Sequence, residues 1–514
     1  MKTSTVPIQI RCSDRHTLQE EIYSSIRRSI LEGLIGGHCR LPSTRSLAAD
    51  LGVSRTTVLL ALDNLRAEGY LVSRPRSGTF IAKDLPDRLP AAQVPRAAGI
   101  VHPEFSARGR ALAQSRCPAW RDPTFPRAFR LGTPAVDLFP LPLWSKISQQ
   151  CVKTNRPSRL DYSQLIGLPA LREAIAEQVR SRGTTCDPNQ VIVTAGAQPA
   201  LHLVFQLLLD PGDPVWMEEP GYPGAHSALM AAGADVRLMP VDTDGIDIAS
   251  SVTGRSRITV ECRGNLESRG NTENRAHAGP SARLAYVTPS HQFPLGVAMS
   301  LERRRNLLAW ASRSRAWIVE DDYDCDFRFQ AQPLPCLHAL DPEGRVIYVG
   351  TFSKTLFPAL RLGFLIVPND LADGVAAARI ATDIHPPLLE QAILAEFMAR
   401  GHYQRHLRRM RVAYMERLDA LQRAIQSSGA PLSPRPVPSG LHLVADLDGV
   451  AAEGVVTEAK ARGIEVMPLS HYYYGSGPRE NALVLGIAAV RPAAIRTGVS
   501  QLALAIEAAR RAAV

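Results

Sequence analysis

Hydrophobic and polar positions divide the chain into three regions. Up to about Lys83, apolar residues recur at helical spacing and predict a compact, helix-rich domain over residues 16–83. Residues 84–127 lack apolar periodicity and are rich in Pro, Ala and Arg, which predicts a semi-extended linker. Residues 128–514 alternate short β-branched runs with helical stretches and predict a second, larger domain.

The larger region predicts an α/β fold. Its expected strands are Val191–Thr194, Pro214–Glu218, Leu284–Thr288, Trp317–Asp321 and Val346–Gly350. Its expected helices include Ala197–Leu209, Leu301–Ser314 and Gln404–Ile425. This alternation is typical of a mostly parallel sheet covered by helices. Residues 252–281 break the pattern, because they are polar, aperiodic and rich in Gly, Asn and Arg, and we expect a flexible insertion there.

The composition excludes several classes of protein. The chain has 514 residues, of which 45% are hydrophobic and 21% charged, as in ordinary globular proteins. No apolar run approaches the ~20 residues that span a bilayer, and residues 1–11 lack the apolar core of a secretory signal. The eight cysteines form no Cys-x-x-Cys pair, which argues against a disulfide framework and favours the cytoplasm. The net charge of +10 permits nucleic-acid binding without proving it.

The segment Leu41–Leu65 has the pattern of a helix-turn-helix. Ala48 is small enough for two helices to cross, Gly52 supplies the turn, and Ser54 is a good N-cap for the second helix. The first turn of that helix presents Arg55, Thr56 and Thr57, where a recognition helix meets base edges and phosphates. The segment therefore predicts contact with the major groove of double-stranded DNA.

A short hairpin is expected to follow the two helices. Leu71–Ser73 and Thr79–Ile81 alternate as strands around Arg74, Arg76 and Gly78, which predicts a basic wing. The alternative is a small helical bundle with a hairpin that binds no DNA. The joint occurrence of the helix spacing, the basic turn and the wing favours DNA binding.

The segment Tyr348–Val367 carries the sharpest chemical signal. A strand ends in small hydroxyl residues and is followed by Lys354, and apolar surroundings there suit a lysine to form a Schiff base. Thr351, Ser353 and Arg361 supply hydroxyl and guanidinium groups for a phosphate. Alone, one lysine and one arginine near a strand are usually surface charges.

Three further segments strengthen this signal. Ala197 and Gln198 open a helix after a strand, and helix N-termini bind anions. Asp321 and Tyr323 end another strand, where a carboxylate can keep a pyridine nitrogen protonated and a phenol can bond the 3-oxygen of the ring. Tyr222 lies on a Pro/Gly-rich turn and can stack on a planar ring, or else cover the edge of the core. The carboxylates could instead bind a metal, but no histidines follow closely, so we expect no metal site.

Together these segments resemble the pyridoxal phosphate site of fold-type I aminotransferases over nearly all of Leu131–Val514. The resemblance implies a mixed, mostly parallel sheet with a smaller C-terminal α/β subdomain. It also implies that Lys354 forms the Schiff base, Asp321 pairs with the pyridine nitrogen, Tyr323 bonds the phenolic oxygen and Tyr222 stacks. The implied phosphate ligands are Ala197, Gln198, Thr351, Ser353, Arg361 and, from the partner subunit of a dimer, the residue equivalent to Tyr162.

The N-terminal segment resembles the winged helix of GntR-type bacterial repressors, whose motif matches "LPSTRSLAADLGVSRTTV". The resemblance implies DNA contacts by Arg45, Arg55, Thr56, Thr57, Arg76 and Gly78. Leu59 departs from relatives that carry a basic residue at that position, so base preference cannot be transferred.

A winged helix followed by an aminotransferase-like domain resembles the MocR/GabR-type bacterial regulators. "YVTPSHQFPLG" and "HLRRMRVAYMERLDAL" are close to the wording of that family, although Leu295 replaces the usual threonine. The resemblance implies a sensor domain and a homodimer swapped head to tail. The effector would be a small amine, an amino acid or a vitamin B6 form that alters operator binding through an aldimine at Lys354. The protein would be cytoplasmic and would associate with the nucleoid when it binds DNA.

One position separates a sensor from an enzyme. Enzymes of this fold fix the substrate carboxylate with an arginine on a late strand, which we place at "ALVLGIAAV", where the matching residue is Val484. Arg479 and Arg491 are close in sequence but out of register. Loss of this contact, about 1.5–3 kcal/mol, favours a transcriptional regulator. The alternatives are an active aminotransferase with a fused DNA-binding domain, and a vestigial domain that binds no cofactor and only dimerises.

Overall fold

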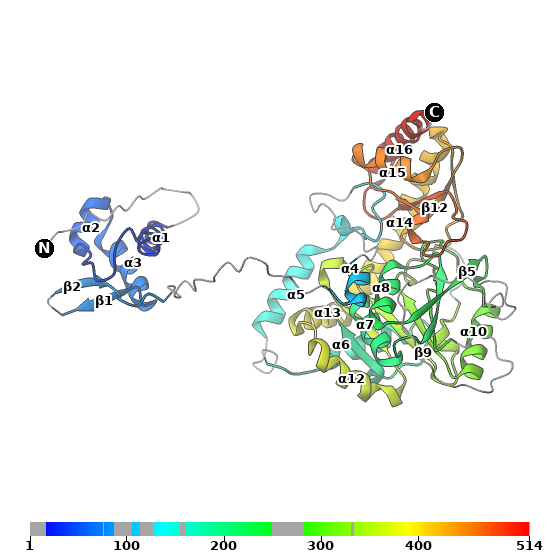
Figure 1. Ribbon diagram of the computed structural model, residues 1–514, viewed down its shortest axis with the longest axis horizontal. Coiled ribbons are helices and arrows are strands. Elements are labelled where there is room, and N and C mark those ends of the chain that lie inside the picture. The colour runs from blue at the N-terminus through cyan, green and yellow to red at the C-terminus, as the bar shows by residue number, and fades with distance from the viewer. Residues whose placement is uncertain are drawn as a thin grey trace. The chain divides into compact units, whose positions relative to one another are not determined.

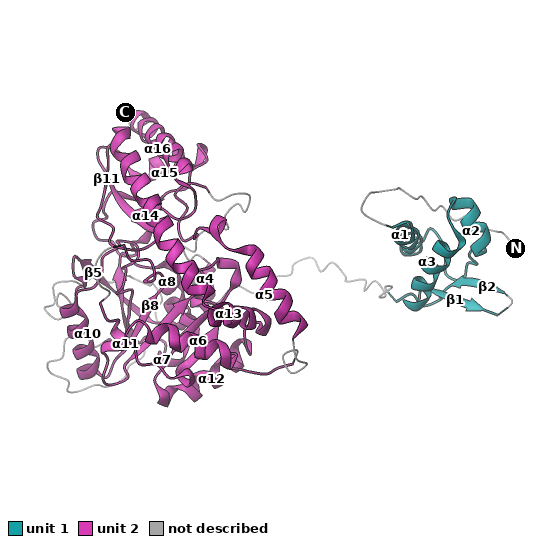
Figure 2. Ribbon diagram, turned by 180° about the vertical axis from the view of Figure 1, so that it is seen from behind, with its two compact units in different colours: residues 1–103 teal, residues 104–514 magenta. Residues whose placement is uncertain are grey.

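The computed structural model describes residues 17–75, 77–86, 105–113, 127–154, 161–248, 282–329 and 334–512. The chain forms two compact units, Met1–Pro103 and Glu104–Val514, coloured separately in Figure 2. The expected insertion at 252–281 lies outside the described residues. None of the described helices is both long and apolar enough to cross a membrane.

The first unit consists of three helices and a two-stranded hairpin (Figure 1). Its elements are α1 (Leu18–Leu31), α2 (Thr44–Leu51), α3 (Arg55–Ala67), β1 (Leu71–Arg74) and β2 (Gly78–Ile81). Ser43 and Ser54 cap α2 and α3, and Gly52 ends α2 with a φ of 64°, which an L residue adopts with difficulty. Ile26, Val58 and similar apolar side chains fill the core between the helices. The predicted helix-turn-helix and hairpin are therefore confirmed.

The second unit is built on an eight-stranded mixed sheet with the order β3-β10-β9-β8-β7-β4-β5-β6. The strands are β3 (Val191–Thr194), β4 (Pro214–Glu219), β5 (Asp235–Asp242), β6 (Gly245–Ile246), β7 (Leu284–Val287), β8 (Trp317–Asp322), β9 (Val346–Thr351) and β10 (Gly363–Ile366). The central strands run parallel, whereas β10 lies antiparallel between β3 and β9. All five strands expected from the sequence are present, with ends that differ by one residue at most.

Helices cover both faces of this sheet (Figure 1). Apolar side chains of one face pack with α7 (Ala197–Leu208), α8 (Pro223–Ala232) and α12 (Asn369–Asp383). The other face packs with α5 (Leu141–Lys153), α6 (Pro169–Arg180), α13 (Leu388–Ala399) and α14 (His402–Ser428). Towards β5 the sheet is covered by α10 (Leu301–Ser314) and α11 (Leu337–Leu340). The parallel strands are thus buried on both sides, as such sheets require.

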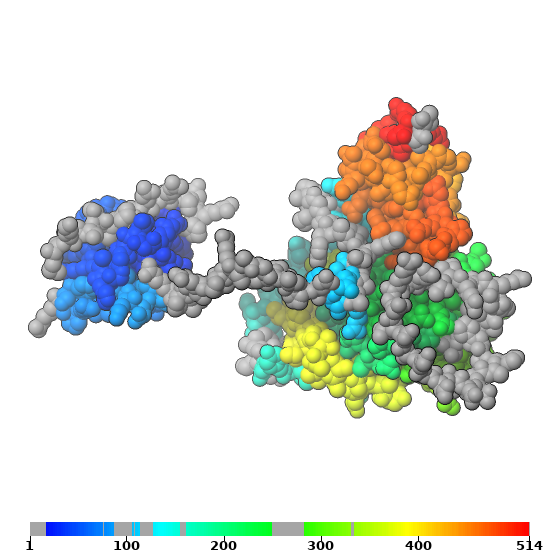
Figure 3. Space-filling view, in the orientation of Figure 1, coloured from blue at the N-terminus to red at the C-terminus, as the bar shows by residue number. Residues whose placement is uncertain are grey.

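A smaller α/β subdomain completes the second unit and forms a distinct lobe, drawn in orange and red in Figure 3. Its antiparallel sheet has the order β11-β12-β14-β13, from β11 (Leu432–Pro434), β12 (His442–Leu447), β13 (Met467–Pro468) and β14 (Ala482–Gly486). The helices α15 (Ala452–Ala461) and α16 (Pro492–Ala512) pack on this sheet.

The stretch predicted as a linker contains a helix that the sequence pattern did not reveal. The helix α4 (Ala107–Ala113) contacts α8, and Ser106 caps it by accepting a hydrogen bond from the Gly109 N–H at 3.0 Å. An N-cap and packing on another element stabilise a helix too short to show apolar periodicity. The linker prediction was therefore incomplete.

Candidate functional site

The first turn of α3 presents its polar side chains to solvent. Arg55 and Thr56 are exposed and Thr57 is half-buried. The Ser54 side chain accepts the Thr57 N–H at 3.1 Å, which fixes the start of the helix. Arg45, on the first turn of α2, is also exposed. The side chains predicted to contact DNA on the two helices are therefore accessible in the first unit.

The predicted wing residue Gly78 packs against Arg40, a residue that the sequence did not indicate. Gly78 has a φ of +107°, and a Cβ added there would lie 2.8 Å from Nε of Arg40. Glycine is therefore required both by the backbone conformation and by the arginine beside it. Arg74 lies over the ring of Phe80 at 4.9 Å, while the predicted contact Arg76 lies outside the described residues. Arg40 precedes the helix-turn-helix motif, so no pattern linked it to the wing.

In the second unit, Lys354 lies in the turn after β9. Its Nζ donates to the Gly132 carbonyl at 2.9 Å, so the amine faces the segment that enters the large domain. Gly132 has a φ of +71°, and a Cβ there would lie 2.7 Å from Nζ. A side chain at residue 132 would thus occupy the position of the lysine amine.

Asp321, near the end of β8, has one satisfied and one unsatisfied oxygen. Its Oδ2 accepts the Tyr286 hydroxyl at 2.8 Å, and its Oδ1 is buried without a hydrogen-bond partner among the described residues. Burial raises the pKa of Asp321 to about 7, while Tyr286 and the charge of Lys354 oppose this rise. A pyridinium N–H would satisfy the free oxygen and stabilise its charge, so the carboxylate fits the predicted cofactor.

Tyr323 belongs to a buried hydrogen-bond network that the sequence analysis missed. Its hydroxyl donates to the His291 carbonyl at 2.9 Å, and Nδ1 of His291 lies 2.9 Å from Oδ2 of Asp324. Nearby, Nε2 of His442 lies 3.0 Å from the Pro294 carbonyl, and burial lowers the pKa of His442 to about 3, so this ring is neutral. His291 stands far from Asp324 in sequence and only the fold brings them together.

The expected phosphate ligands converge at the start of α7. Ala197 and Gln198 are its first residues, and Gly196 before them has a φ of +111°. A Cβ at Gly196 would lie 3.4 Å from the Arg361 guanidinium, so that cation faces the helix N-terminus. Both the helix dipole and the guanidinium favour an anion here. A phosphate therefore fits this end of the site.

Thr351 and Ser353 lie at the end of β9 next to Lys354, and Tyr222 contacts the start of α7. Thr351 ends β9, and its Oγ1 accepts the Ser353 N–H at 3.2 Å. The Tyr222 ring lies across Gly224, where an added Cβ would be 2.5 Å from ring atoms. Its hydroxyl lies 3.4 Å from Oε1 of Gln198, which ties the ring to the start of α7.

No described contact brings Tyr162 to this group of expected cofactor residues. Its side chain is 75% exposed, and its ring lies 6.3 Å from that of His385.

The strand β14 of the small subdomain carries no arginine or lysine at the position where aminotransferases bind the substrate carboxylate. Val484 is fully buried on β14 between Val444 and Met467, in an apolar cluster that includes Leu131. Arg491 is paired with Asp137, which is remote in sequence, at 3.2 Å. The side chain at position 484 therefore presents no charge to a ligand carboxylate.

Comparisons with known proteins agree with this architecture. Residues 18–81 match the family "Bacterial regulatory proteins, gntR family", and residues 129–502 match "Aminotransferase class I and II". The probable rhizopine catabolism regulatory protein MocR of Rhizobium meliloti is 40% identical over 94% of this chain and 93% of its own length. The HTH-type transcriptional regulator TauR of Rhodobacter capsulatus is 32% identical over 95% and 97%. An active aminotransferase is not favoured, because these relatives span both units and are named as regulators.

A solved structure supports the cofactor. The α-aminoadipate aminotransferase LysN of Thermus thermophilus, complexed with N-(5'-phosphopyridoxyl)-L-leucine, superimposes with a TM-score of 0.65 at 27% identity, covering 80% of this chain and 96% of LysN. The family, this neighbour and the unsatisfied Asp321 oxygen support pyridoxal phosphate as the cofactor of the second unit. The chain belongs to the MocR-type transcriptional regulators, in which a gntR-family DNA-binding helix-turn-helix is joined to an aminotransferase class I and II domain.

Proposed function

We propose that the second unit binds pyridoxal phosphate covalently at Lys354, senses the cofactor itself or a small amine or amino acid there, and thereby alters operator binding by the first unit. The observation that carries this proposal is the buried Asp321, whose free oxygen is within electrostatic influence of Lys354. A buried carboxylate that has a donor for only one of its oxygens is costly unless a ligand supplies the second donor.

Each residue has a physical role in this proposal. Pyridoxal phosphate, when bound, supplies an aldehyde carbon that a primary amine can attack. Lys354 provides the amine of the protein, and Asp321 holds a proton at the pyridine nitrogen. Tyr323 would turn its hydroxyl from the His291 carbonyl to the 3-oxygen, and Tyr222 would exclude water from one face of the ring. The start of α7 and Arg361 hold the phosphate.

The proposed regulator is a homodimer, and both cofactor binding and operator recognition would depend on the second subunit. The exposed Tyr162 side chain is available to reach the cofactor phosphate of a partner subunit. Paired winged helices would read paired half-sites on operator DNA. A ligand can shift operator binding only if it binds two arrangements of the subunits with different affinities. We place this activity in the cytoplasm, at the nucleoid.

Substitution of Lys354 by alanine tests the proposal. Wild-type protein purified with pyridoxal phosphate should show visible absorbance and, after borohydride reduction, a mass adduct on Lys354. Lys354→Ala should lack both and should bind a selected operator duplex without responding to the cofactor. A wild-type protein that stays colourless with excess cofactor, or an adduct on another lysine, would overturn the proposal.

A further inference from the structure

A polar cavity of about 320 Å³ lies on the face of the sheet opposite to Asp321. Adjacent residues of a strand point to opposite faces, so Asp321 faces Tyr286 and the α7 side, whereas Asp322 faces Tyr348 and the α6 side. The cavity lies between the ends of β8 and α6 and the first half of α14. Its volume is within the range of small-molecule sites, which begins at about 300 Å³.

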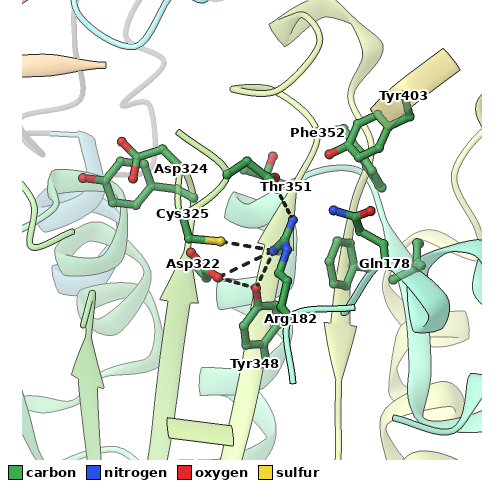
Figure 4. A pocket seen from close by; sticks show the side chains of 14 residues that line it. Gln178, Arg182, Asp322, Asp324, Cys325, Tyr348, Thr351, Phe352 and Tyr403 are labelled. Carbon is green, nitrogen blue, oxygen red and sulfur yellow. Dashed lines mark hydrogen bonds and ion pairs between the residues drawn. The ribbon is translucent and has the colours of Figure 1, made fainter. Parts of the chain in front are cut away.

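A smaller space adjoins the inner end of this cavity and shares Arg182, Asp322 and Tyr348 with it; Figure 4 shows the residues that line this smaller space. Nη2 of Arg182 donates to Oδ1 of Asp326 at 2.6 Å, and its Nη1 lies 3.9 Å from Oδ2 of Asp322. The Tyr348 hydroxyl donates to the same Asp322 oxygen. Asp322 is only 8% exposed, and its Oδ1 has no hydrogen-bond partner within the described part of the chain. The cavity is therefore bordered at this end by a buried carboxylate, with the Cys325 thiol and the Tyr348 hydroxyl beside it.

The outer end of the cavity carries excess positive charge. Arg411, on α14, lines the cavity and donates from Nε to the backbone carbonyl of Asp326 at 2.6 Å. Arg328 also lines it, and its guanidinium makes no hydrogen bond or ion pair to any residue that the structure describes. Together with Arg182, three arginines face two carboxylates.

Arg328 also lies near a second, buried cation. Arg304 donates to three backbone carbonyls, those of Met299, Pro335 and Pro289. Burial lowers the pKa of Arg304; the nearby Glu320 carboxylate opposes this shift, and the charge of Arg328 adds to it. Because a half-buried guanidinium beside a like charge is stabilised by an anion, the outer end favours an oxyanion that Arg328 and Arg411 can bind.

We propose that this cavity is a second ligand site, for a small molecule that presents a carboxylate or phosphate to Arg328 and Arg411 and a hydroxyl or ammonium group to Asp322. The cavity lies on the other face of the sheet from Asp321, and the small space at its inner end is also bordered by Tyr323 and Thr351, two of the expected cofactor residues. The ligand in this cavity would contact Asp322, and the cofactor would contact Asp321, so adjacent residues of β8 would bind the two ligands.

Calorimetric titration of the full chain, saturated with pyridoxal phosphate, tests this proposal. Saturation fills the phosphate position of the cofactor pocket, so that added anions report on other sites. One probe is inorganic phosphate, and the other is lactate, which has a carboxylate and a hydroxyl but no amine to react with the cofactor. We expect one-to-one binding of at least one probe, and the probe that binds identifies phosphate or carboxylate as the recognised group.

Two variants and a matched control assign the binding to the cavity. Arg328→Gln and, from a different element, Arg411→Gln should each weaken probe binding at least tenfold and leave the visible absorbance of the cofactor unchanged. Arg423→Gln, at an exposed arginine of α14 paired with Asp419, should leave the affinity unchanged. The proposal is overturned if neither probe binds the wild-type protein. It is also overturned if Arg328→Gln and Arg411→Gln, where they fold, bind the probe with the wild-type affinity.

Discussion

Replacing Asp321 by asparagine should make the cofactor-free protein more stable at pH 8 and weaken its binding of pyridoxal phosphate. Burial raises the pKa of this carboxyl from an ordinary value of 3.8 to about 7. At about 1.36 kcal/mol for each pH unit between the two values, the ionised carboxylate destabilises the fold by at most about 4 kcal/mol. Asparagine has no charge to bury and can still accept the Tyr286 hydroxyl.

The sign of this effect depends on pH. Below about pH 4 the carboxyl is protonated in both the folded and the unfolded chain, and the destabilisation is absent. As the pH rises towards 7, the unfolded chain ionises first and the free energy of unfolding falls; above about pH 7 the loss is complete. The stability difference between Asp321→Asn and wild type should therefore grow between pH 4 and 7.

Thermal unfolding of the cofactor-free proteins, followed by circular dichroism at pH 5 and pH 8, measures this difference. Asp419→Asn, at an exposed and ion-paired carboxylate of α14, is the matched control and should show no such pH dependence. Glu320, whose pKa burial raises to about 7, is present in all three proteins and cancels. The charge of Asp321 adds to the raised pKa of Glu218, so Asp321→Asn also lowers the pKa of Glu218 and increases the expected difference in the same direction. An Asp321→Asn protein no more stable than wild type at pH 8 would refute the reasoning.

Three further outcomes are expected. Arg55→Ala should weaken binding to a selected operator duplex by about 1–3 kcal/mol in a gel-shift titration, with unchanged cofactor absorbance, whereas Arg66→Ala, at an arginine of the same helix paired with Asp63, should have little effect. Loss of both DNA binding and absorbance in Arg55→Ala would instead indicate unfolding. Gly132→Ala should reduce the rate and extent of cofactor attachment, followed by visible absorbance, because its Cβ would lie 2.7 Å from the Lys354 amine; attachment at the wild-type rate would contradict this geometry. Deletion of residues 252–281 should leave the absorbance intact, and a colourless deletion variant would contradict that expectation.

Local patterns in the sequence predicted much of the fold. The caps and the glycine of the helix-turn-helix depend on adjacent residues, so Ser54 and Gly52 could be assigned before the structure was seen. Five strands of the large sheet, β3, β4, β7, β8 and β9, were also predictable, because strands buried on both faces are continuous apolar runs. The antiparallel insertion of β10 into the sheet was not, since strand order depends on tertiary packing.

The candidate site was predictable only in part for the same reason. Lys354 and Arg361 share one loop, and their chemistry could be read from the residues themselves. His291 and Arg328 have no distinctive neighbours in sequence. Their possible roles depend on side chains that approach from other elements, the Tyr323 hydroxyl in one case and the cavity wall in the other.

The antiparallel pairing of β9 with β10 has a consequence for which ligands the pocket accepts. Thr351 and Gly363 are register partners, so the loop between them is anchored at both ends by the same two strands. That loop carries the amine of Lys354 and the guanidinium of Arg361, and the distance between these groups is therefore set within one hairpin, not by the relative position of two domains. A movement of the small subdomain would therefore change the surroundings of a bound ligand. It would leave unchanged the distance between the Lys354 amine and the Arg361 guanidinium, and the ligand must match that distance with its aldehyde and its phosphate.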